Sequence, residues 1–202
     1  MFLATKRADS LIAGLSESGY RVSDDLDIRR TADGQIHRED RKFVFWPVRT
    51  TVGRAERHMD MREFRAYQER EIRRALNYVW RTLGWAVYAD ETLWLSEKGE
   101  GGLGLGPELN TIWHQGRSAG ISLIASSQRP SWLPRAAYSA PRHLFFFQTS
   151  DKEDRKRLTD IGGAIDADTV GRVISTLGRY EFLYIRPRDN PPILLRSKVD
   201  KR

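Results

Sequence analysis

The sequence predicts an α/β fold, with a mostly parallel sheet flanked by helices. Short apolar runs alternate with helical segments along the 202 residues. Several runs, among them 85–89 and 121–125, are apolar on both faces, as are the strands of a parallel sheet that is covered on two sides. The clearest helix, residues 61–83, has apolar side chains at three- and four-residue intervals, opposite arginine and glutamate.

The first part of the chain is expected to contain two strands and two helices. In order, these are a strand at residues 2–4, a short helix at 8–20, a strand at 43–48 and the helix at 61–83. Pro47 shortens the second strand, because proline cannot donate to the hydrogen-bond ladder of a sheet. Gly84 ends the long helix. The charged residues from 21 onward form part of a polar insertion at 21–60.

The second part alternates strands and helices again. In order, it holds a strand at 85–91, a glycine-rich loop at 99–106, a helix, strands at 121–126 and 143–148, two helices ending near residues 161 and 177, and a strand at 180–185. Pro107 suits the first turn of its helix. Ser150 and Glu153 have the spacing of a capping box at the start of the next helix. Residues 187–202 are interpreted as a polar tail, so we expect one domain over 1–186.

The composition limits the classes of partner and of chemistry. A net charge of +7 favours a polyanion as partner. The chain has no cysteine and its four histidines are scattered, so disulfide, zinc and redox chemistry are not expected. No apolar run approaches the ~20 residues of a membrane span, and the apolar segment of a signal peptide is lacking. We therefore expect a cytoplasmic protein.

Two adjacent carboxylates, Asp90 and Glu91, end the apolar run WAVYADE. Phosphoryl transfer to water needs a group that holds Mg²⁺ and a group that deprotonates the attacking water. Successive side chains of a strand point apart, so Asp90 is a candidate for the Mg²⁺ shell through water, and Glu91 for the general base. The alternative interpretation is a solvated acidic pair at the end of a buried strand.

A neutral amide follows the next apolar run. In ISLIASSQRP, Ser126 and Ser127 lead to Gln128. An amide at the tip of a neighbouring strand can bind a γ-phosphate or the attacking water without taking its proton. Gln128 is therefore a candidate nucleotide sensor, and the alternative is a polar residue bonded to nearby backbone.

VYADE, the helix that ends in Gln115-Gly116-Arg117, and GISLIASSQRP together resemble the core of the HerA/FtsK superfamily of P-loop ATPases. The resemblance covers about residues 80–160, and more loosely extends to 186. It implies a RecA-like core in a hexameric ring that uses ATP and Mg²⁺ to pump DNA. It also implies that Asp90 and Glu91 are the Walker B pair, that Gln128 is the polar sensor, and that Arg117 contacts a nucleotide across a subunit boundary.

Arg117 has a physical argument of its own, because an always-charged planar guanidinium suits the charge that develops on a γ-phosphate. The alternative is an arginine that complements the dipole at a helix C-terminus. Either role is compatible with the sequence.

One part of the family pattern is absent from the 202 residues, which contain no G-x-x-x-x-G-K-[ST] loop. The loop at 99–106 lacks the required Lys and Ser/Thr, so we interpret it as a mobile connector. Lys6 is expected to be a solvated lysine at a strand end. Residues 2–6 resemble the second strand of the family, so the sequence predicts a core that lacks its first strand and phosphate loop. Such a truncated core would expose its neighbouring strands and be inactive alone.

Direct contact with DNA is the remaining expectation. Arg129, Arg135 and Arg142 lie in one segment with Trp132 and Tyr138 interleaved, which suits phosphate contacts and base stacking. The alternative is that these arginines only make the surface soluble.

The leading hypothesis is an ATPase core that couples hydrolysis to DNA translocation in conjugation, segregation or phage systems. Whether this chain is itself an enzyme depends on its completion by a phosphate loop. A second hypothesis is a non-hydrolysing DNA-binding or assembly module on the same scaffold. A third is another α/β enzyme, such as a magnesium-dependent nuclease.

Overall fold

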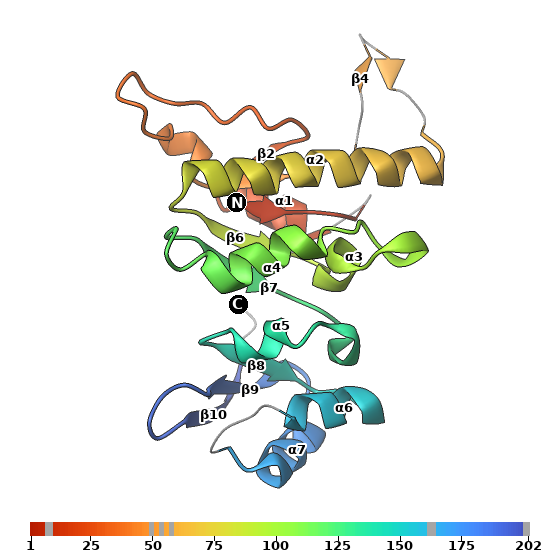
Figure 1. The fold of residues 1–202 in the computed structure, drawn as a ribbon, viewed down its shortest axis with the longest axis vertical. Helices are drawn as coiled ribbons and strands as arrows, with labels where there is room; N and C mark the ends of the chain where they lie inside the picture. The colour runs from red at the N-terminus through yellow and green to blue at the C-terminus, as the bar shows by residue number, and fades with distance from the viewer. Residues whose placement is uncertain (7–9, 49–50, 53–54, 57–58, 161–164, 200–202) are drawn as a thin grey trace. The chain divides into compact units, whose positions relative to one another are not determined.

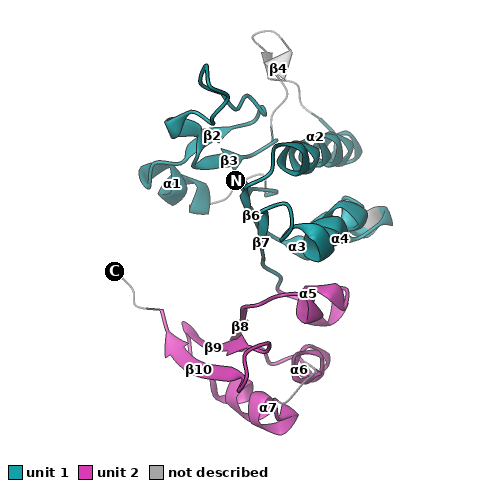
Figure 2. Ribbon diagram, turned by 60° about the vertical axis from the view of Figure 1, so that its left-hand side comes forward, with its two compact units in different colours: residues 1–127 teal, residues 128–202 magenta. Residues whose placement is uncertain are grey.

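The computed structural model describes residues 1–202 apart from 7–9, 49–50, 53–54, 57–58, 161–164 and 200–202 (Figure 1). Its two compact units, Met1–Ser127 (unit 1) and Gln128–Arg202 (unit 2), are each described by themselves (Figure 2). The expectation of one domain over 1–186 stays a prediction. No helix within the described ranges is long and apolar enough to cross a membrane.

Unit 1 is built on a five-stranded sheet in the order β2-β3-β1-β6-β7. Its strands are β1 (Phe2–Leu3), β2 (Arg21–Ser23), β3 (Phe43–Phe45), β6 (Ala86–Ala89) and β7 (Ser122–Ala125). All four pairings between them are parallel. The predicted α/β fold with a mostly parallel sheet is therefore confirmed. A separate pair of short strands, β4 (Thr51–Val52) and β5 (Ala55–Glu56), is antiparallel.

Helices flank both faces of this sheet. They are α1 (Ser10–Glu17), α2 (Met61–Thr82), α3 (Thr92–Ser96) and α4 (Gly106–Gln115), with short 3-10 turns at Arg38–Asp40 and Gly99–Gly101. Alternate residues of β1 serve the two faces. Leu3 packs in the main core with apolar residues of α2 and α4. Phe2 packs in a smaller core with Ile12 of α1.

Helix α2 and strand β3 form where the sequence predicts a helix and a strand. Helix α2 begins after Asp60, whose side chain accepts a hydrogen bond from the Glu63 amide, while the Glu63 side chain accepts one from the Asp60 amide. This capping box satisfies two amides that the first turn leaves unpaired. The helix ends at Leu83 and Gly84, which both have positive φ. Strand β3 ends two residues before Pro47, as its missing N–H requires.

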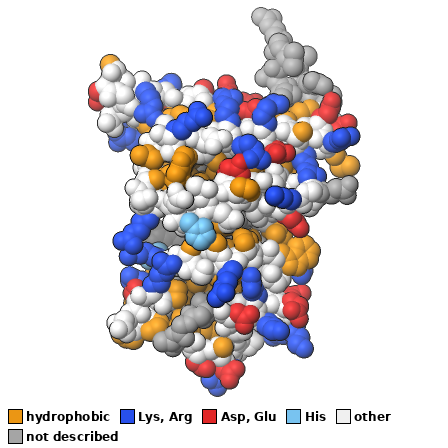
Figure 3. All heavy atoms as spheres, in the orientation of Figure 1, with side chains coloured by type: hydrophobic (Ala, Val, Ile, Leu, Met, Phe, Trp, Pro, Cys, Tyr) orange, Lys and Arg blue, Asp and Glu red, His pale blue; other side chains and the backbone are white. Residues whose placement is uncertain are grey.

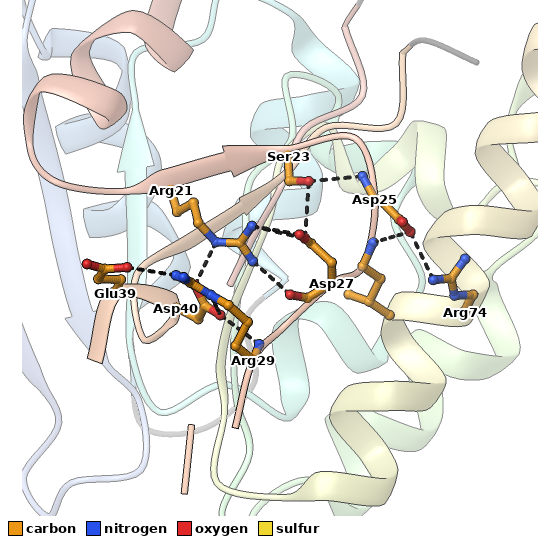
Figure 4. Close-up of polar contacts among 9 residues, drawn as sticks. Arg21, Ser23, Asp25, Asp27, Arg29, Glu39, Asp40 and Arg74 are labelled. Carbon is orange, nitrogen blue, oxygen red and sulfur yellow. Dashed lines mark hydrogen bonds and ion pairs between the residues drawn. The ribbon is translucent and has the colours of Figure 1, made fainter. Parts of the chain in front are cut away.

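The segment predicted as a polar insertion contributes a strand, β2, that the sequence analysis missed. Ion pairs hold the loop that follows it (Figure 4). The buried Asp40 side chain accepts hydrogen bonds from the Arg29 amide and guanidinium at 2.7–3.1 Å. Arg21 adds an ion pair at 2.6 Å without hydrogen-bond geometry. These contacts, with the Arg29 side chain first, hold the pKa of Asp40 well below its usual range.

Unit 2 is a three-stranded antiparallel sheet with helices on one face. Its elements are a 3-10 turn at Pro130–Trp132, α5 (Ala136–Ser139), β8 (Leu144–Phe147), α6 (Lys152–Thr159), α7 (Ala167–Thr176), β9 (Glu181–Arg186) and β10 (Ile193–Lys198). The strand order is β10-β9-β8. Leu144 and Phe146 pack on Leu158 of α6 and Ile174 of α7.

Two local expectations for unit 2 are wrong. The cap of α6 is Asp151, which accepts hydrogen bonds from the Glu153 and Asp154 amides, rather than Ser150. A carboxylate in place of a hydroxyl also complements the helix dipole. The predicted polar tail at 187–202 contains β10, because Leu194 and Arg196 pair with the β9 residues Ile185 and Leu183.

Candidate functional site

Polar side chains gather where three neighbouring strands of unit 1 end. Lys6 follows β1, Asp90 and Glu91 follow β6, and Ser126 follows β7. The strands are parallel and adjacent in the order β1-β6-β7, so their carboxyl ends lie at one edge of the sheet. Ligand sites of open parallel sheets form at this edge. The candidate site is therefore built from unit 1 residues alone.

Lys6 forms ion pairs with both carboxylates. Its Nζ lies 3.4 Å from Asp90 Oδ2 and 3.2 Å from Glu91 Oε1. The hydrogen bond that Lys6 donates to Glu91 and the charge of Asp90 raise the pKa of Lys6, although desolvation opposes the shift. Lys6 is exposed near a strand end, as expected, and the two ion pairs are an addition that the sequence did not indicate. Its ammonium occupies the position of a cation between the two acids.

Glu91 has a left-handed backbone, with φ 49° and ψ 56°. A non-glycine residue in this region carries strain, and such strain concentrates at functional sites. Strand β6 ends at Ala89, and this turn then brings the Glu91 side chain back to the same lysine as Asp90. The expectation that the two carboxylates point apart is therefore wrong, because it assumed that the strand continues through Glu91.

Hydrogen bonds from hydroxyl groups hold Asp90 and the backbone around it in place. Ser126 Oγ donates to Asp90 Oδ1 at 3.0 Å. The Thr92 amide donates to the Ser126 carbonyl at 2.8 Å, and Thr92 Oγ1 donates to the Ala89 carbonyl at 3.0 Å. Thr92 is fully buried, so these bonds exchange little with water. The sequence analysis missed both hydroxyls as site residues, although the serine directly after an apolar run is the signal that could have indicated Ser126.

A buried amide supports the end of β1. Gln68 of α2 is fully buried and its Nε2 donates to the Thr5 carbonyl at 2.7 Å. Its Oε1 has no hydrogen-bond partner among the described residues. The contact fixes the backbone immediately before Lys6, and so fixes the direction from which the lysine approaches the acids.

The other predicted site residues lie elsewhere. Arg117 is exposed and precedes β7, so it lies beyond the opposite end of that strand from Ser126. Gln128 and Arg129 are the first residues of unit 2, which is described by itself, so the sensor role of Gln128 stays a prediction. Arg129 forms ion pairs with Asp151 and Asp154 at 3.7 and 3.6 Å.

Arg135 and Arg142 are also exposed residues of unit 2. The grouping of Arg129 with them as a DNA-contacting segment stays a prediction. Of the three, Arg129 also stacks over the Trp132 ring, at 5.1 Å.

The glycine-rich segment 99–106 is anchored, contrary to its interpretation as a mobile connector. Leu103 and Leu105 are buried in the core of unit 1. Their amides donate to the carbonyls of Trp94 and Leu95 at 2.7 and 2.8 Å. Two leucines between the glycines were the missed signal, because apolar side chains in a loop indicate packing.

The acids fit a hard cation in their donor chemistry. Mg²⁺ binds through one or two carboxylates while keeping waters and substrate phosphates as its other ligands. Asp90 and Glu91 offer carboxylate oxygens around a lysine ammonium, with Ser126 as a further oxygen. The described residues contain no cluster of three or more His, Cys, Asp or Glu that could hold a metal without such outside ligands.

No family model and no curated protein matches this chain. Among solved structures, it is similar to B204, the DNA-packaging ATPase from Sulfolobus Turreted Icosahedral Virus, at 17% identity and a TM-score of 0.54, over 99% of this chain and 96% of that one. It is also similar to the genome packaging NTPase B204 from Sulfolobus turreted icosahedral virus 2 in complex with AMPPCP, at 15% identity and a TM-score of 0.51, over 100% and 97%. At these identities the likeness establishes the fold alone.

Proposed function

We propose that this chain is the core of a motor ATPase that couples ATP hydrolysis to the movement of DNA. The observation that carries the proposal is the convergence of Asp90 and Glu91 at the carboxyl edge of a parallel sheet, beside Ser126. The likeness in fold to the packaging NTPase B204 supports it. The proposed protein works in the cytoplasm, as a homo-oligomeric ring, in a process such as genome packaging, conjugation or segregation.

Each residue of the edge has a role in this proposal. Glu91 takes a proton from the attacking water, and its strained turn holds the carboxylate in place. Asp90, fixed by Ser126, would hold Mg²⁺ through water. When bound, that ion would neutralise charge on the phosphates of ATP. Gln128 acts as the polar sensor, and Arg117 acts on the nucleotide of a neighbouring subunit.

The position of Arg117 in the fold is the reason for proposing that it acts on the nucleotide of a neighbouring subunit. Arg117 is exposed and precedes β7, whereas the acids follow β6 at the opposite end of the parallel strands, so Arg117 cannot face the acids of its own subunit. Its guanidinium is free to reach a site on another copy in a ring. A mixture of Arg117→Ala and wild-type subunits should therefore hydrolyse more ATP than the two parts separately, whereas a helix-capping role would leave turnover unaffected.

The phosphates of ATP need a further segment. The 202 residues contain no G-x-x-x-x-G-K-[ST] loop. Strand β7 is an edge of the unit 1 sheet, and the Ile124 side chain on it is 56% exposed. A parallel strand added to β7 would end beside Ser126, so a phosphate loop after that strand would face Asp90. We infer that residues outside these 202 supply this strand and loop.

A second candidate function has its own observation. Lys6 forms ion pairs with both acids, and the 202 residues contain no phosphate loop to accompany them. A chain in this state suits a DNA-binding or assembly module that does not hydrolyse ATP. Salt-dependent DNA binding that is indifferent to ATP would favour this module. Metal-dependent cutting of DNA without ATP would instead favour a nuclease.

The test is ATP turnover by the native full-length protein and its Glu91→Gln variant. Loss of the general base should lower turnover by about 100-fold or more while ATP binding is retained. Glu97→Gln is the matched control, because Glu97 is an exposed glutamate six residues away. Undiminished hydrolysis in Glu91→Gln would remove Glu91 from the base role and overturn the proposal.

A further inference from the structure

An open groove of about 640 Å³ runs between α6 and α7 of unit 2. Lys152, Arg155 and Lys156 of α6 line it on one side. Their spacing of three and four residues places these cations on one face of the helix. Arg172 of α7 lines the other side. The groove is therefore bordered by positive charge from two elements.

Small side chains lie where the two helices that border this groove approach each other. A Cβ added to Gly171 of α7 would lie 3.3 Å from Thr159 Cγ2 of α6. Glycine at this position lets the two helices approach closely. Thr159 and Gly171 both line the groove. None of the described residues that line it is aromatic, so they offer charge to a backbone but no surface on which a base would stack.

The acids at the start of α6 offset its cations only in part, although Asp151 has a charge interaction with Arg155. Asp151 caps the helix by accepting from the Glu153 and Asp154 amides. Asp154 is buried, and it accepts from the amide and the hydroxyl of Ser131 at 2.9 and 2.5 Å. Neither carboxylate lines the groove. Lys152 is exposed and has no ion pair with another described residue.

The acids that do line the groove are fewer than its cations. Asp166 caps α7 and accepts from the Thr169 amide at 2.8 Å and from its hydroxyl. Its charge is thereby committed to the helix N-terminus. Asp168 is the other carboxylate along the groove. Four cations against these two acids leave a positive surface.

We propose that the groove between α6 and α7 binds the phosphate backbone of duplex DNA, independently of base sequence. The inference rests on the proposed function for the presence of DNA, and it locates where DNA is held. It differs from the segment with Arg129, Arg135 and Arg142, where Arg129 is already paired with Asp151 and Asp154. Rows of cations without stacking groups are typical of backbone contacts.

The experiment is a salt titration of duplex DNA binding by the whole chain, followed by fluorescence anisotropy. In a Lys152→Gln/Lys156→Gln variant, loss of two phosphate contacts should reduce the slope of log K against log salt by about 2. Affinity at low salt should fall roughly tenfold. A Lys42→Gln/Lys98→Gln variant is the charge-matched control, because both lysines are exposed residues of unit 1, and we expect less than a twofold change. Circular dichroism should be unchanged in both, because these side chains are exposed.

The outcomes separate this inference from the proposed function. If the wild-type chain binds DNA and both variants lose the same affinity or none, the groove is not the DNA-binding site, and the motor proposal stays intact. If the wild-type chain binds no DNA, both the assignment of the groove and the proposed DNA role are wrong. A Lys152→Arg/Lys156→Arg variant should bind as the wild type does, since the contacts need charge, and a loss there would also contradict the inference.

Discussion

In the five-stranded sheet of unit 1 all four strand pairings are parallel, whereas in the three-stranded sheet of unit 2 both are antiparallel. Parallel strands bring their carboxyl ends to one edge, and the acids of unit 1 meet there. An antiparallel sheet distributes its strand ends to both edges, and the groove of unit 2 lies between helices instead. The comparison teaches that strand direction decides where polar groups converge, so chemistry is expected in unit 1 and charge recognition in unit 2.

The units also differ in how their sheets are covered. Leu3 of β1 is fully buried, and helices pack on both faces of the unit 1 sheet. In unit 2, α6 and α7 cover one face, while Phe145 and Phe147 on the other face are 55% and 54% exposed. Charged side chains also differ between the units, and Figure 3 shows arginine along α2 with carboxylates between the arginines. Several α2 arginines form ion pairs, for example Arg74 with Glu71 at 3.0 Å.

The largest expected effect separates the functions of the two units. Asp90→Asn in the native full-length protein should reduce ATP turnover by about 100-fold or more, because the carboxylate of the proposed Mg²⁺ site is lost. DNA affinity at the unit 2 groove should remain unchanged. Turnover assays and anisotropy on the same preparation measure both. A parallel loss of DNA affinity would break the assignment of chemistry and recognition to different units.

Core truncations test whether each unit has its own stability. Leu3→Ala in unit 1 and Leu183→Ala in unit 2 remove fully or nearly fully buried leucines, at 0% and 2% exposure. Each should lower the free energy of unfolding by about 3 kcal/mol. Hydrogen exchange with mass spectrometry should show the loss of protection in the peptides of the mutated unit. Equal loss in both units would mean that they unfold together.

The ion network of unit 1 gives a smaller effect that depends on pH. Asp40→Asn should destabilise unit 1 by roughly 2 kcal/mol near neutral pH, since it leaves two arginines without their shared carboxylate. The pKa of Asp40 is lowered on folding, so its contribution is complete above its unfolded pKa and is lost as the pH falls further. Denaturation series in urea at several pH values measure this. The control is the exposed Glu17→Gln, and an identical acid profile for both would refute the account.

The smallest expected effect concerns the N-terminal amine of the 202-residue chain. The Met1 amine donates to the Ala86 carbonyl at 2.7 Å, and burial lowers its pKa from 8.0 to about 6. Between these values the unfolded chain binds more protons, so unit 1 should gain about 1 to 2 kcal/mol in unfolding free energy from pH 6 to pH 8. Acetylation of the amine should remove that gain. Its persistence in the acetylated chain would assign it to other groups.

Much of the fold of unit 1 was predictable because local signals agree with tertiary packing. The periodicity of residues 61–83 and the position of Pro47 determined α2 and the end of β3. Strand β2 was not predictable, because Arg21 and Ser23 are polar and the strand depends on its pairing with β3. Strand β10, in the predicted tail, was not predicted for a similar reason, since it depends on pairing with β9.

The two acids of the candidate site were predictable from the sequence, whereas the lysine and hydroxyls around them and the geometry of the site were not. Asp90 and Glu91 follow an apolar run, which indicated a strand end. The left-handed turn at Glu91 has no glycine or asparagine to mark it, so the convergence on Lys6 could not be read from the sequence. The contact itself joins residues that are more than eighty positions apart in the chain. Its existence depends on the strand order β1-β6.

The most direct test of the central claim is the intact mass and N-terminal sequence of the protein isolated from its native source. The account predicts a mass above 23.3 kDa, with additional residues that contain a strand followed by G-x-x-x-x-G-K-[ST]. Such a segment would complete the edge at β7 and supply the phosphate loop. A native protein of 23.3 kDa that begins at Met1 would contradict the account and favour the non-hydrolysing DNA-binding module.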